Sequence, residues 1–322
     1  MSTRAEDVYS SADTATESSP IRFVTAASLF DGHDAAINVM RRLIQDQGVE
    51  VIHLGHNRSV ADVVRAAVQE DADGIAISSY QGGHNEYFRY MVDMLNEAGA
   101  GHVRVFGGGG GTITPEEIAE LHDYGVERIY HPHDGMKLGL LGMIEDLVTR
   151  TVSARRETTV PEAISTEDAL SVAQMLSAIE DGIIPPARLD TLRKEWRMTA
   201  GIVPVIGITG TGGAGKSSVT DEILSRFCQY LPDLRIAVLA VDPTRRRTGG
   251  ALLGDRIRMN SLSNNDLYMR SLASRGSGSE ISANLDRAIE VAKAVGFDLI
   301  FCETSGIGQG SDAITTVADH SL

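Results

Sequence analysis

The sequence predicts an α/β protein in which two units of parallel β-sheet are joined by a helical segment. Three observations support this prediction. Residues 21–150 alternate short β-branched runs with segments of helical spacing, residues 151–200 show no strand pattern, and a second strand–helix alternation begins near residue 201 at a glycine-rich turn. The chain has 322 residues, which is long enough for two separate hydrophobic cores.

The first 20 residues are polar, rich in Ser and Thr and without periodicity, which predicts a disordered tail. The first unit, residues 21–150, then contains five candidate strands, and a helical segment follows each. Ser59 with Asp62, and Pro115 with its acidic neighbours, mark two helix starts. Right-handed crossovers predict a flavodoxin-like, doubly wound sheet of strand order 2-1-3-4-5. The expected strands are 22–28, 49–55, 73–79, 102–108 and 126–132.

In a sheet of this order, ligands bind beyond the carboxyl ends of the first and third strands. The loop after the first strand contains Asp31 and His33, and the third strand ends near Ser78. Five consecutive glycines, 107–111, follow the fourth strand, where a bulky ligand could approach the backbone closely. We therefore expect a ligand site at this edge of the sheet.

The residue types at this edge limit the possible ligands. The carboxylates of "DGHDAA" would repel the phosphate of a flavin mononucleotide, and a phosphoacceptor receiver would need an aspartate where the third strand ends in serines. An imidazole that can bond to a neighbouring carboxylate is a typical metal ligand. One histidine is a poor site for a free ion, but it suits a metal that a macrocycle already holds.

These loops resemble the DxHxxG…SxL…GG signature of the cobalamin-binding domain in the methylmalonyl-CoA mutase family. The matching residues are Asp31, His33, Ser78, Gly108 and Gly109. Two positions differ, because Ala36 replaces a glycine and Tyr80 replaces a leucine of the signature. Neither change affects the metal ligand.

The resemblance implies a role for each matching residue. His33 would bind cobalt in place of the cofactor's lower base, and Asp31 would orient the imidazole. Ser78 would hydrogen-bond to the displaced base, while Gly108 and Gly109 would leave room for its nucleotide tail.

Residues 151–200 predict a helical linker between the two units. One helix is expected over 164–182, capped by Ser165 with Asp168, and a second over 187–198, which includes Trp196. Their apolar positions predict packing against a neighbouring domain.

The second unit, residues 201–322, begins with "GTGGAGKS" between a β-run and a helical pattern, which is the context of a P-loop. In such a loop successive N–H groups point at phosphates, Lys216 reaches the β- and γ-phosphates, and the Ser217 hydroxyl binds Mg²⁺. The expected nucleotide-binding residues are Gly210, Thr211, Gly212, Gly213, Ala214, Gly215, Lys216, Ser217 and Ser218.

Two further carboxylates end candidate strands of this unit. Asp242 follows "RIAVLAV" and Glu303 follows "FDLIFC", so both are expected at the edge that holds the phosphates. Asp242 as a helix or turn cap is the alternative. Gly306, in "ETSGIGQ", is expected to sense the γ-phosphate.

The stretches "VDPTRRRTGGALLGDRIRM" and "ETSGIGQGSDA" resemble the G-protein chaperones that serve cobalamin-dependent acyl-CoA mutases. The resemblance implies GTP as the nucleotide, Arg258 near it, and Lys216 and Glu303 as catalytic residues. The implied Mg²⁺ contacts are Ser217, Asp242, Asp255, Glu303 and Thr304. Guanine specificity follows from the resemblance alone, because no NKxD motif occurs before Leu322.

The order of these parts resembles the N-terminal part of isobutyryl-CoA mutases fused to their own G-protein chaperone. This implies radical isomerisation of isobutyryl-CoA to n-butyryl-CoA by adenosylcobalamin, with GTP hydrolysis gating cofactor loading. The acyl-CoA barrel is missing, so the chain is expected to be a fragment without mutase activity, from a full-length homodimer. A stand-alone cobalamin carrier or sensor controlled by nucleotide state, and an ATP-dependent metal-insertion protein, remain alternatives.

Composition excludes two further classes of partner. A formal charge of −15 argues against nucleic acid, and the sequence contains no apolar run long enough for a membrane span. The N-terminus also lacks the apolar core of a signal peptide, so a cytoplasmic protein is expected.

Overall fold

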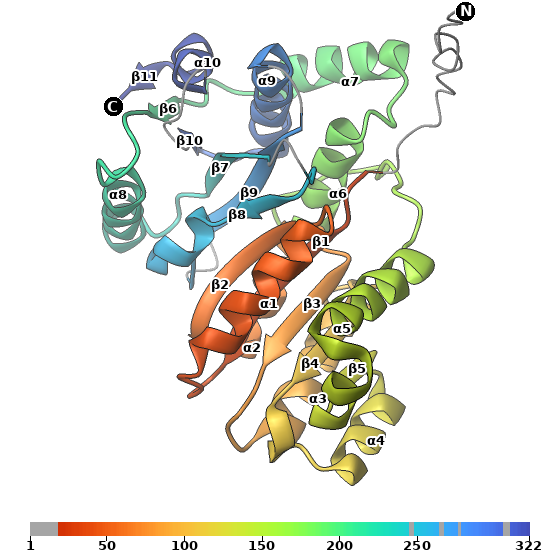
Figure 1. Cartoon of the computed structure of the whole chain (residues 1–322). Helices are drawn as coiled ribbons and strands as arrows, with labels where there is room; N and C mark the ends of the chain where they lie inside the picture. Colours follow the sequence, from red (N-terminus) through yellow and green to blue (C-terminus); the bar gives the residue numbers. More distant parts are fainter. Residues whose placement is uncertain (1–18, 245–247, 264–266, 276–277, 305–309) are drawn as a thin grey trace, which may run out of the picture.

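A computed structural model describes residues 19–244, 248–263, 267–275, 278–304 and 310–322. Two parallel β-sheets form the centres of two units, with the first unit in red to lime and the second in cyan to blue (Figure 1). The expected disordered tail lies almost entirely outside the described residues. In the described part, no helix is both long and apolar enough to cross a lipid bilayer.

The first sheet confirms the predicted strand order. Its strands are β1 (Arg22–Ser28), β2 (Glu50–Arg58), β3 (Gly74–Ser78), β4 (Arg104–Gly108), β5 (Arg128–Tyr130) and β8 (Ala251–Leu253). They are arranged β5-β4-β3-β1-β2-β8, so the first five follow the order 2-1-3-4-5. Adjacent strands are parallel, for example Val24 opposite Ile75 across β1 and β3. The carboxyl ends of these strands therefore meet at one edge.

Helices cover both faces of this sheet. They are α1 (Asp34–Asp46), α2 (Val60–Gln69), α3 (His84–Glu97), α4 (Pro115–Tyr124) and α5 (Pro132–Ala154), with the short 3₁₀ turn η1 (Gly110–Thr112). α1 and α5 pack on one face around Phe23 and Phe106, whereas α2 and α3 pack on the other. The two predicted helix starts are confirmed: Ser59 Oγ accepts a hydrogen bond from the Asp62 N–H, and Pro115 begins α4 inside a Thr114–Glu117 capping box.

Two helices follow, α6 (Ala169–Glu180) and α7 (Pro186–Thr199). The cap predicted for the first was wrong. The N-cap is Asp168, which accepts a hydrogen bond from the Ser171 N–H at 3.1 Å, whereas Ser165 Oγ accepts from the Glu167 N–H in the preceding turn. The predicted packing of the linker is confirmed, because Trp196 is buried in one hydrophobic cluster with residues of the second sheet.

The second sheet has strands β6 (Val205–Ile208), β7 (Ile236–Pro243), β9 (Leu267–Ser274), β10 (Leu299–Thr304) and β11 (His320–Ser321), in the order β11-β6-β10-β7-β9. Its helices are α8 (Lys216–Tyr230), α9 (Gly278–Val295) and α10 (Gly310–Val317), and the 3₁₀ turns are η2 (Asp255–Arg258) and η3 (Asn260–Ser263). All strand pairs of this sheet are parallel, so their carboxyl ends also share one edge.

The two units are joined by a strand that the sequence did not predict. β8 belongs to the second unit by its place in the chain, yet it pairs with β2 at the edge of the first sheet, where Leu252 lies opposite Val51 (Figure 1). Buried ion pairs reinforce this contact. Arg22 on β1 and Arg275 after β9 both bond to the Glu50 carboxylate, at 2.7 Å and 2.6 Å.

Candidate functional site

The first candidate site begins at the carboxyl end of β1, where Asp31 holds His33. The buried Asp31 carboxylate accepts hydrogen bonds from the His33 N–H and the Tyr80 N–H, and His33 Nδ1 lies 2.8 Å from Asp31 Oδ1. Burial alone would raise the pKa of Asp31, but these hydrogen bonds hold it below its ordinary value. Because an ionised carboxylate only accepts, Nδ1 donates to it, and in the neutral tautomer that this bond selects Nε2 is the nitrogen with the lone pair.

The His33 side chain is available to a ligand. It is 61% exposed, while the Asp31 side chain that fixes it is fully buried. The Tyr80 ring lies beside the imidazole, with the ring centroids 5.3 Å apart. The structure therefore presents one oriented imidazole nitrogen to solvent, which could serve as a single ligand to a metal.

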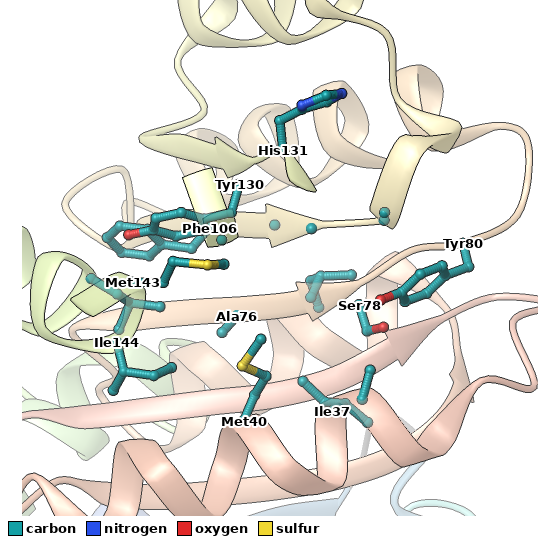
Figure 2. A pocket seen from close by; sticks show the side chains of 18 of the residues that line it. Ile37, Met40, Ala76, Ser78, Tyr80, Phe106, Tyr130, His131, Met143 and Ile144 are labelled. Atoms are coloured by element: carbon teal, nitrogen blue, oxygen red, sulfur yellow. The ribbon is translucent and has the colours of Figure 1, made fainter. Parts of the chain in front are cut away.

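An apolar cavity of about 280 Å³ opens between α1, α5 and the ends of β3 and β4 (Figure 2). Its lining residues are Ala36, Ile37, Met40, Ile44, Ala76, Ile77, Ser78, Tyr80, Phe106, Gly107, Gly108, Gly109, Gly110, Tyr130, His131, Pro132, Gly135, Met143, Ile144 and Leu147. Ser78 Oγ is buried and has no hydrogen-bond partner among the described residues. A flat apolar group with one polar atom for this hydroxyl fits such a cavity.

The glycines after β4 have different structural reasons. A Cβ on Gly109 would overlap the backbone oxygen of Ser79, so this position requires glycine. Gly110 has a positive φ of 59° and packs under the Tyr80 ring. Gly108 lies at the cavity wall, where a Cβ would meet only the Tyr130 oxygen at 3.6 Å, in ordinary contact. The backbone therefore approaches the cavity closely at these three positions.

The sequence reasoning missed the wall that faces α1. Tyr130 at the end of β5 and Met143 and Ile144 on α5 close the cavity on this side (Figure 2). Leu147 on α5 also belongs to the lining. Their signal in the sequence is a helical apolar spacing that is indistinguishable from ordinary core packing.

The second candidate site lies at the carboxyl edge of the second sheet. The P-loop follows β6, and Gly215, with a φ of 89°, is the N-cap of α8. Lys216 Nζ donates to the backbone oxygens of Gly210 and Thr211 at 2.9 Å and 3.1 Å. Phosphate oxygens can replace these carbonyls as acceptors, since the N-terminus of α8 also attracts negative charge.

The predicted metal contacts surround Ser217 at the start of α8. Its Oγ lies 2.6 Å from Glu303 Oε1 and 3.5 Å from Asp255 Oδ1, and it accepts from Arg258 Nη1 at 3.4 Å. Arg258 also donates to Asp255 at 3.2 Å. The structure thus brings together four of the predicted residues from α8, η2 and β10.

Several oxygens here have no bonding partner within the described part of the chain, namely Asp242 Oδ2, Asp255 Oδ2 and Thr304 Oγ1. The pKa of Asp242 is raised well above its usual value by burial and by the neighbouring carboxylate of Asp255. Burial also raises the pKa of Asp255 and of Glu303. Crowded, desolvated oxygen ligands of this kind fit a hard divalent cation.

The acidic side chains are not a metal site by themselves. In the residues that the structure describes, no three His, Cys, Asp or Glu side chains are placed to hold an ion together. Mg²⁺ usually takes one or two carboxylates and completes its shell with water and substrate phosphates, so this spacing fits a metal–nucleotide complex better than a free ion.

A polar cavity of about 600 Å³ contains these groups. Its lining residues are Gln45, Gly212, Gly213, Gly215, Lys216, Ser217, Ser218, Asp242, Leu252, Gly254, Asp255, Arg258, Glu303 and Thr304. Gly210, Thr211 and Ala214 belong to the loop but are not part of this lining. Gly306 lies outside the described residues. Gln45, on α1 of the first unit, was not predicted.

Comparisons with known proteins agree with these two sites. Residues 21–131 match the family described as "B12 binding domain", and residues 152–322 match "Methylmalonyl Co-A mutase-associated GTPase MeaB". The first match covers strands β1 to β5, and the second covers the linker helices, β8 and the whole second sheet.

Longer relatives contain both parts in one chain. The chain is 57% identical over 305 residues to the fused isobutyryl-CoA mutase of Cupriavidus metallidurans, and 54% identical over 313 residues to that of Geobacillus kaustophilus. It is 56% identical over 305 residues to the fused isobutyryl-CoA mutase of Nocardia farcinica. Each match covers 94% of this chain but 28% of the relative.

The match to the GTPase family covers more than half of the chain and includes the P-loop, the acidic cluster and the two linker helices. The chain therefore belongs to the methylmalonyl-CoA mutase-associated GTPase family, with a B12-binding domain preceding the GTPase domain.

Proposed function

We propose that this chain is the cofactor- and nucleotide-binding part of an adenosylcobalamin-dependent mutase that converts isobutyryl-CoA to n-butyryl-CoA. Its GTPase domain gates the loading of the cofactor. One observation supports the proposal most directly. The Asp31-oriented imidazole of His33 packs beside Tyr80, at the edge of an apolar cavity in which the Ser78 hydroxyl has no partner among the described residues.

The residues of the first cavity fit a cobalamin. His33 Nε2 would hold the cobalt, and Asp31 would orient the imidazole through Nδ1. Ser78 would hydrogen-bond to the heterocyclic base of the cofactor, while Gly108 and Gly109 would give its tail access to the sheet. When bound, adenosylcobalamin supplies the radical that starts the isomerisation.

The residues of the second cavity bind GTP with Mg²⁺. Lys216 leaves the loop carbonyls and neutralises the β- and γ-phosphates, and the N–H groups of residues 210–218 surround them. Ser217, Asp242, Asp255, Glu303 and Thr304 orient the ion directly or through water. Arg258 lies within reach of the same phosphates, and Glu303 with Lys216 supports hydrolysis.

Replacing His33 with alanine tests the cobalamin site. We expect cobalamin affinity to fall about 10- to 100-fold, because a metal ligand is lost. The visible spectrum of the bound cofactor should change as well, because the ligand field changes. The matched control is His56→Ala, since His56 is an exposed histidine on the neighbouring strand β2. Equal spectra and affinities for the wild-type chain and His33→Ala would contradict the proposal.

The mutase reaction itself needs the rest of the protein. The match covers 28% of the fused isobutyryl-CoA mutase of Cupriavidus metallidurans, so we expect turnover of isobutyryl-CoA from a protein of that length and none from these 322 residues. A full-length product that binds cobalamin but isomerises no acyl-CoA would favour the alternative, a cobalamin carrier controlled by nucleotide state. Cytoplasmic location and homodimer formation stay predictions.

A further inference from the structure

Helix α1 contacts both cavities. Ile37, Met40 and Ile44 on this helix line the apolar cavity, whereas the next residue, Gln45, lines the polar one. Successive residues of an α-helix point about 100° apart, so the Gln45 side chain points away from the helix face that lines the apolar cavity. The B12-binding domain therefore contributes a side chain to the nucleotide cavity of its neighbour.

Gln45 is held firmly in this position. The residue is 2% exposed, and its backbone oxygen accepts a hydrogen bond from the Gly48 N–H at 3.1 Å. The segment before β8 presses against the same backbone, because a Cβ on Gly250 would overlap the Gln45 oxygen. β8 itself is paired to β2, which follows Gln45 in the chain. Both sides of the contact are thus fixed by sheet pairing.

Among the described residues, the Gln45 side-chain oxygen lacks the partner that burial normally demands. The Oε1 atom is buried and makes no hydrogen bond to any residue that the structure describes. A buried acceptor without a donor is costly, and native proteins rarely keep one without a ligand or water to satisfy it. This atom lies in the lining of the nucleotide cavity, so the missing donor is expected there.

The chemistry of the cavity narrows the choice of donor. Phosphate oxygens and the carboxylates of Asp242, Asp255 and Glu303 only accept hydrogen bonds, so they cannot satisfy Oε1. The lining also carries donors, on Lys216, Ser217, Ser218, Arg258 and Thr304, but within the described residues none of them bonds to Oε1. Water that enters the cavity with the nucleotide can supply the donor. The water that matters most in a nucleotide-hydrolysing site is the one that attacks the terminal phosphate.

We propose that Gln45 positions this water, and so completes the GTPase site from within the B12-binding domain. The inference rests on the proposed GTP hydrolysis. Oε1 accepts one water hydrogen, and the water oxygen bonds to the γ-phosphorus while the bond from phosphorus to the bridging oxygen breaks. GDP leaves with that oxygen, and the water proton passes to the departing inorganic phosphate.

Two replacements of Gln45 test the role. Gln45→Leu keeps the volume but removes the acceptor, and Gln45→Asn keeps the amide but withdraws it by one methylene. We expect both variants to lower the kcat of GTP hydrolysis about 10- to 100-fold, because misplacing a reacting group by about 1 Å has an effect of this size. KM for GTP and affinity for GDP should change less than about threefold, because water positioning adds no ground-state binding.

The control is Gln47→Ala, an exposed glutamine two residues further along the chain, which should behave as wild type. Gln45→Leu should also keep or raise the Tm of the nucleotide-free chain, because it removes a buried, unsatisfied acceptor. A merely structural glutamine would instead lower Tm and leave kcat of the folded fraction unchanged.

Different outcomes would contradict the role of Gln45 and the proposed GTPase function. Wild-type GTP hydrolysis with a folded Gln45→Leu variant of equal kcat overturns the role of Gln45 and leaves the GTPase proposal intact. A higher KM at unchanged kcat also overturns it, since it indicates binding of the phosphates. A wild-type chain that neither binds nor hydrolyses GTP overturns the proposed function, and the inference with it.

Discussion

The two cavities occupy the same place in two similar sheets, yet their linings are chemically opposite. Each lies at the carboxyl edge of a parallel sheet, beside the N-terminus of the helix that follows the first strand of that sheet. The first is apolar. Among its described lining residues, Ser78 is the one whose buried side-chain polar atom has no hydrogen-bond partner. The second contains three carboxylates and a lysine. The sheet determines where a ligand binds, and the loops determine which one.

The difference also appears in the residues that require a ligand. In the first cavity one neutral hydroxyl needs a partner, which suits a neutral heterocycle. In the second, Asp242 and Asp255 carry oxygens without a partner among the described residues, and burial raises the pKa of both carboxyls. A metal ion with its nucleotide would provide partners for the oxygens of the second cavity. It would leave the hydroxyl of the first cavity without a partner. Variants that disturb one cavity should therefore spare the other.

The largest effect is expected from Lys216→Ala in the polar cavity. Truncating one partner of a buried, charged interaction typically lowers affinity by a factor of about 100 or more. Without the Lys216 ammonium group, the carboxylates of Asp242, Asp255 and Glu303 would face the phosphates. Isothermal titration should show this loss for GTP, and cobalamin affinity should stay within about twofold of wild type. Loss of cobalamin binding in the folded variant would show that the cavities are not chemically separate.

A smaller effect, confined to the apolar cavity, is expected from Gly109→Ala. The new Cβ would overlap the Ser79 oxygen and approach Ile113 Cδ1 to 3.3 Å, so the ends of β3 and β4 must move. Overpacking of this kind costs about 1–3 kcal/mol of stability. Thermal unfolding and cobalamin titration should show this loss, whereas GTP affinity should stay unchanged. Gly111→Ala is the matched control, because a Cβ there meets nothing within 4 Å. Equal behaviour of the two variants would contradict the close approach at Gly109.

Much of this arrangement follows from local patterns in the sequence. The alternation of strands and helices predicts the sheet order, and parallel pairing then brings separate loops to one edge. Asp31 and His33 are two residues apart after a buried strand, so their contact is also a local property. The P-loop is local in the same sense, since its glycines and Lys216 act through backbone geometry.

The rest depends on contacts between distant parts of the chain. β8 has three residues, and its pairing with β2 joins segments about 200 residues apart, for which no local pattern exists. Gln45 ends an ordinary amphipathic helix, and only that pairing brings it to the nucleotide cavity. The predicted Ser165 cap was wrong for a different reason. Ser165 and Asp168 are both favourable N-cap residues, and the N-cap is the one whose side chain reaches a free N–H group of the first helical turn.

The smallest predicted effect is an opposite response of the two regions to pH. Burial, together with the charge of Arg41, lowers the pKa of His53 on β2 to about 4. The ring Nδ1 of His53 lies 2.9 Å from Thr25 Oγ1. A histidine in the unfolded chain titrates near 6.5, so the stability that neutral His53 contributes is lost as pH falls from about 6.5 to 4. At the nucleotide edge the pKa of Asp242 is raised, so its burial destabilises the fold as pH rises above about 4.

Two variants separate these contributions in denaturant unfolding at pH 5 and pH 7.5, without nucleotide or Mg²⁺. His53→Gln, which can keep the bond to Thr25, should reduce the loss of stability at pH 5 by about 1–2 kcal/mol. Asp242→Asn should stabilise the chain more at pH 7.5 than at pH 5, because burial and the carboxylate of Asp255 raise the pKa of Asp242 and make its ionisation costly. His56→Gln, at an exposed position of β2, is the control for the histidine. The prediction is contradicted if the stability of His53→Gln relative to wild type does not rise from pH 7.5 to pH 5, or if that of Asp242→Asn does not rise from pH 5 to pH 7.5.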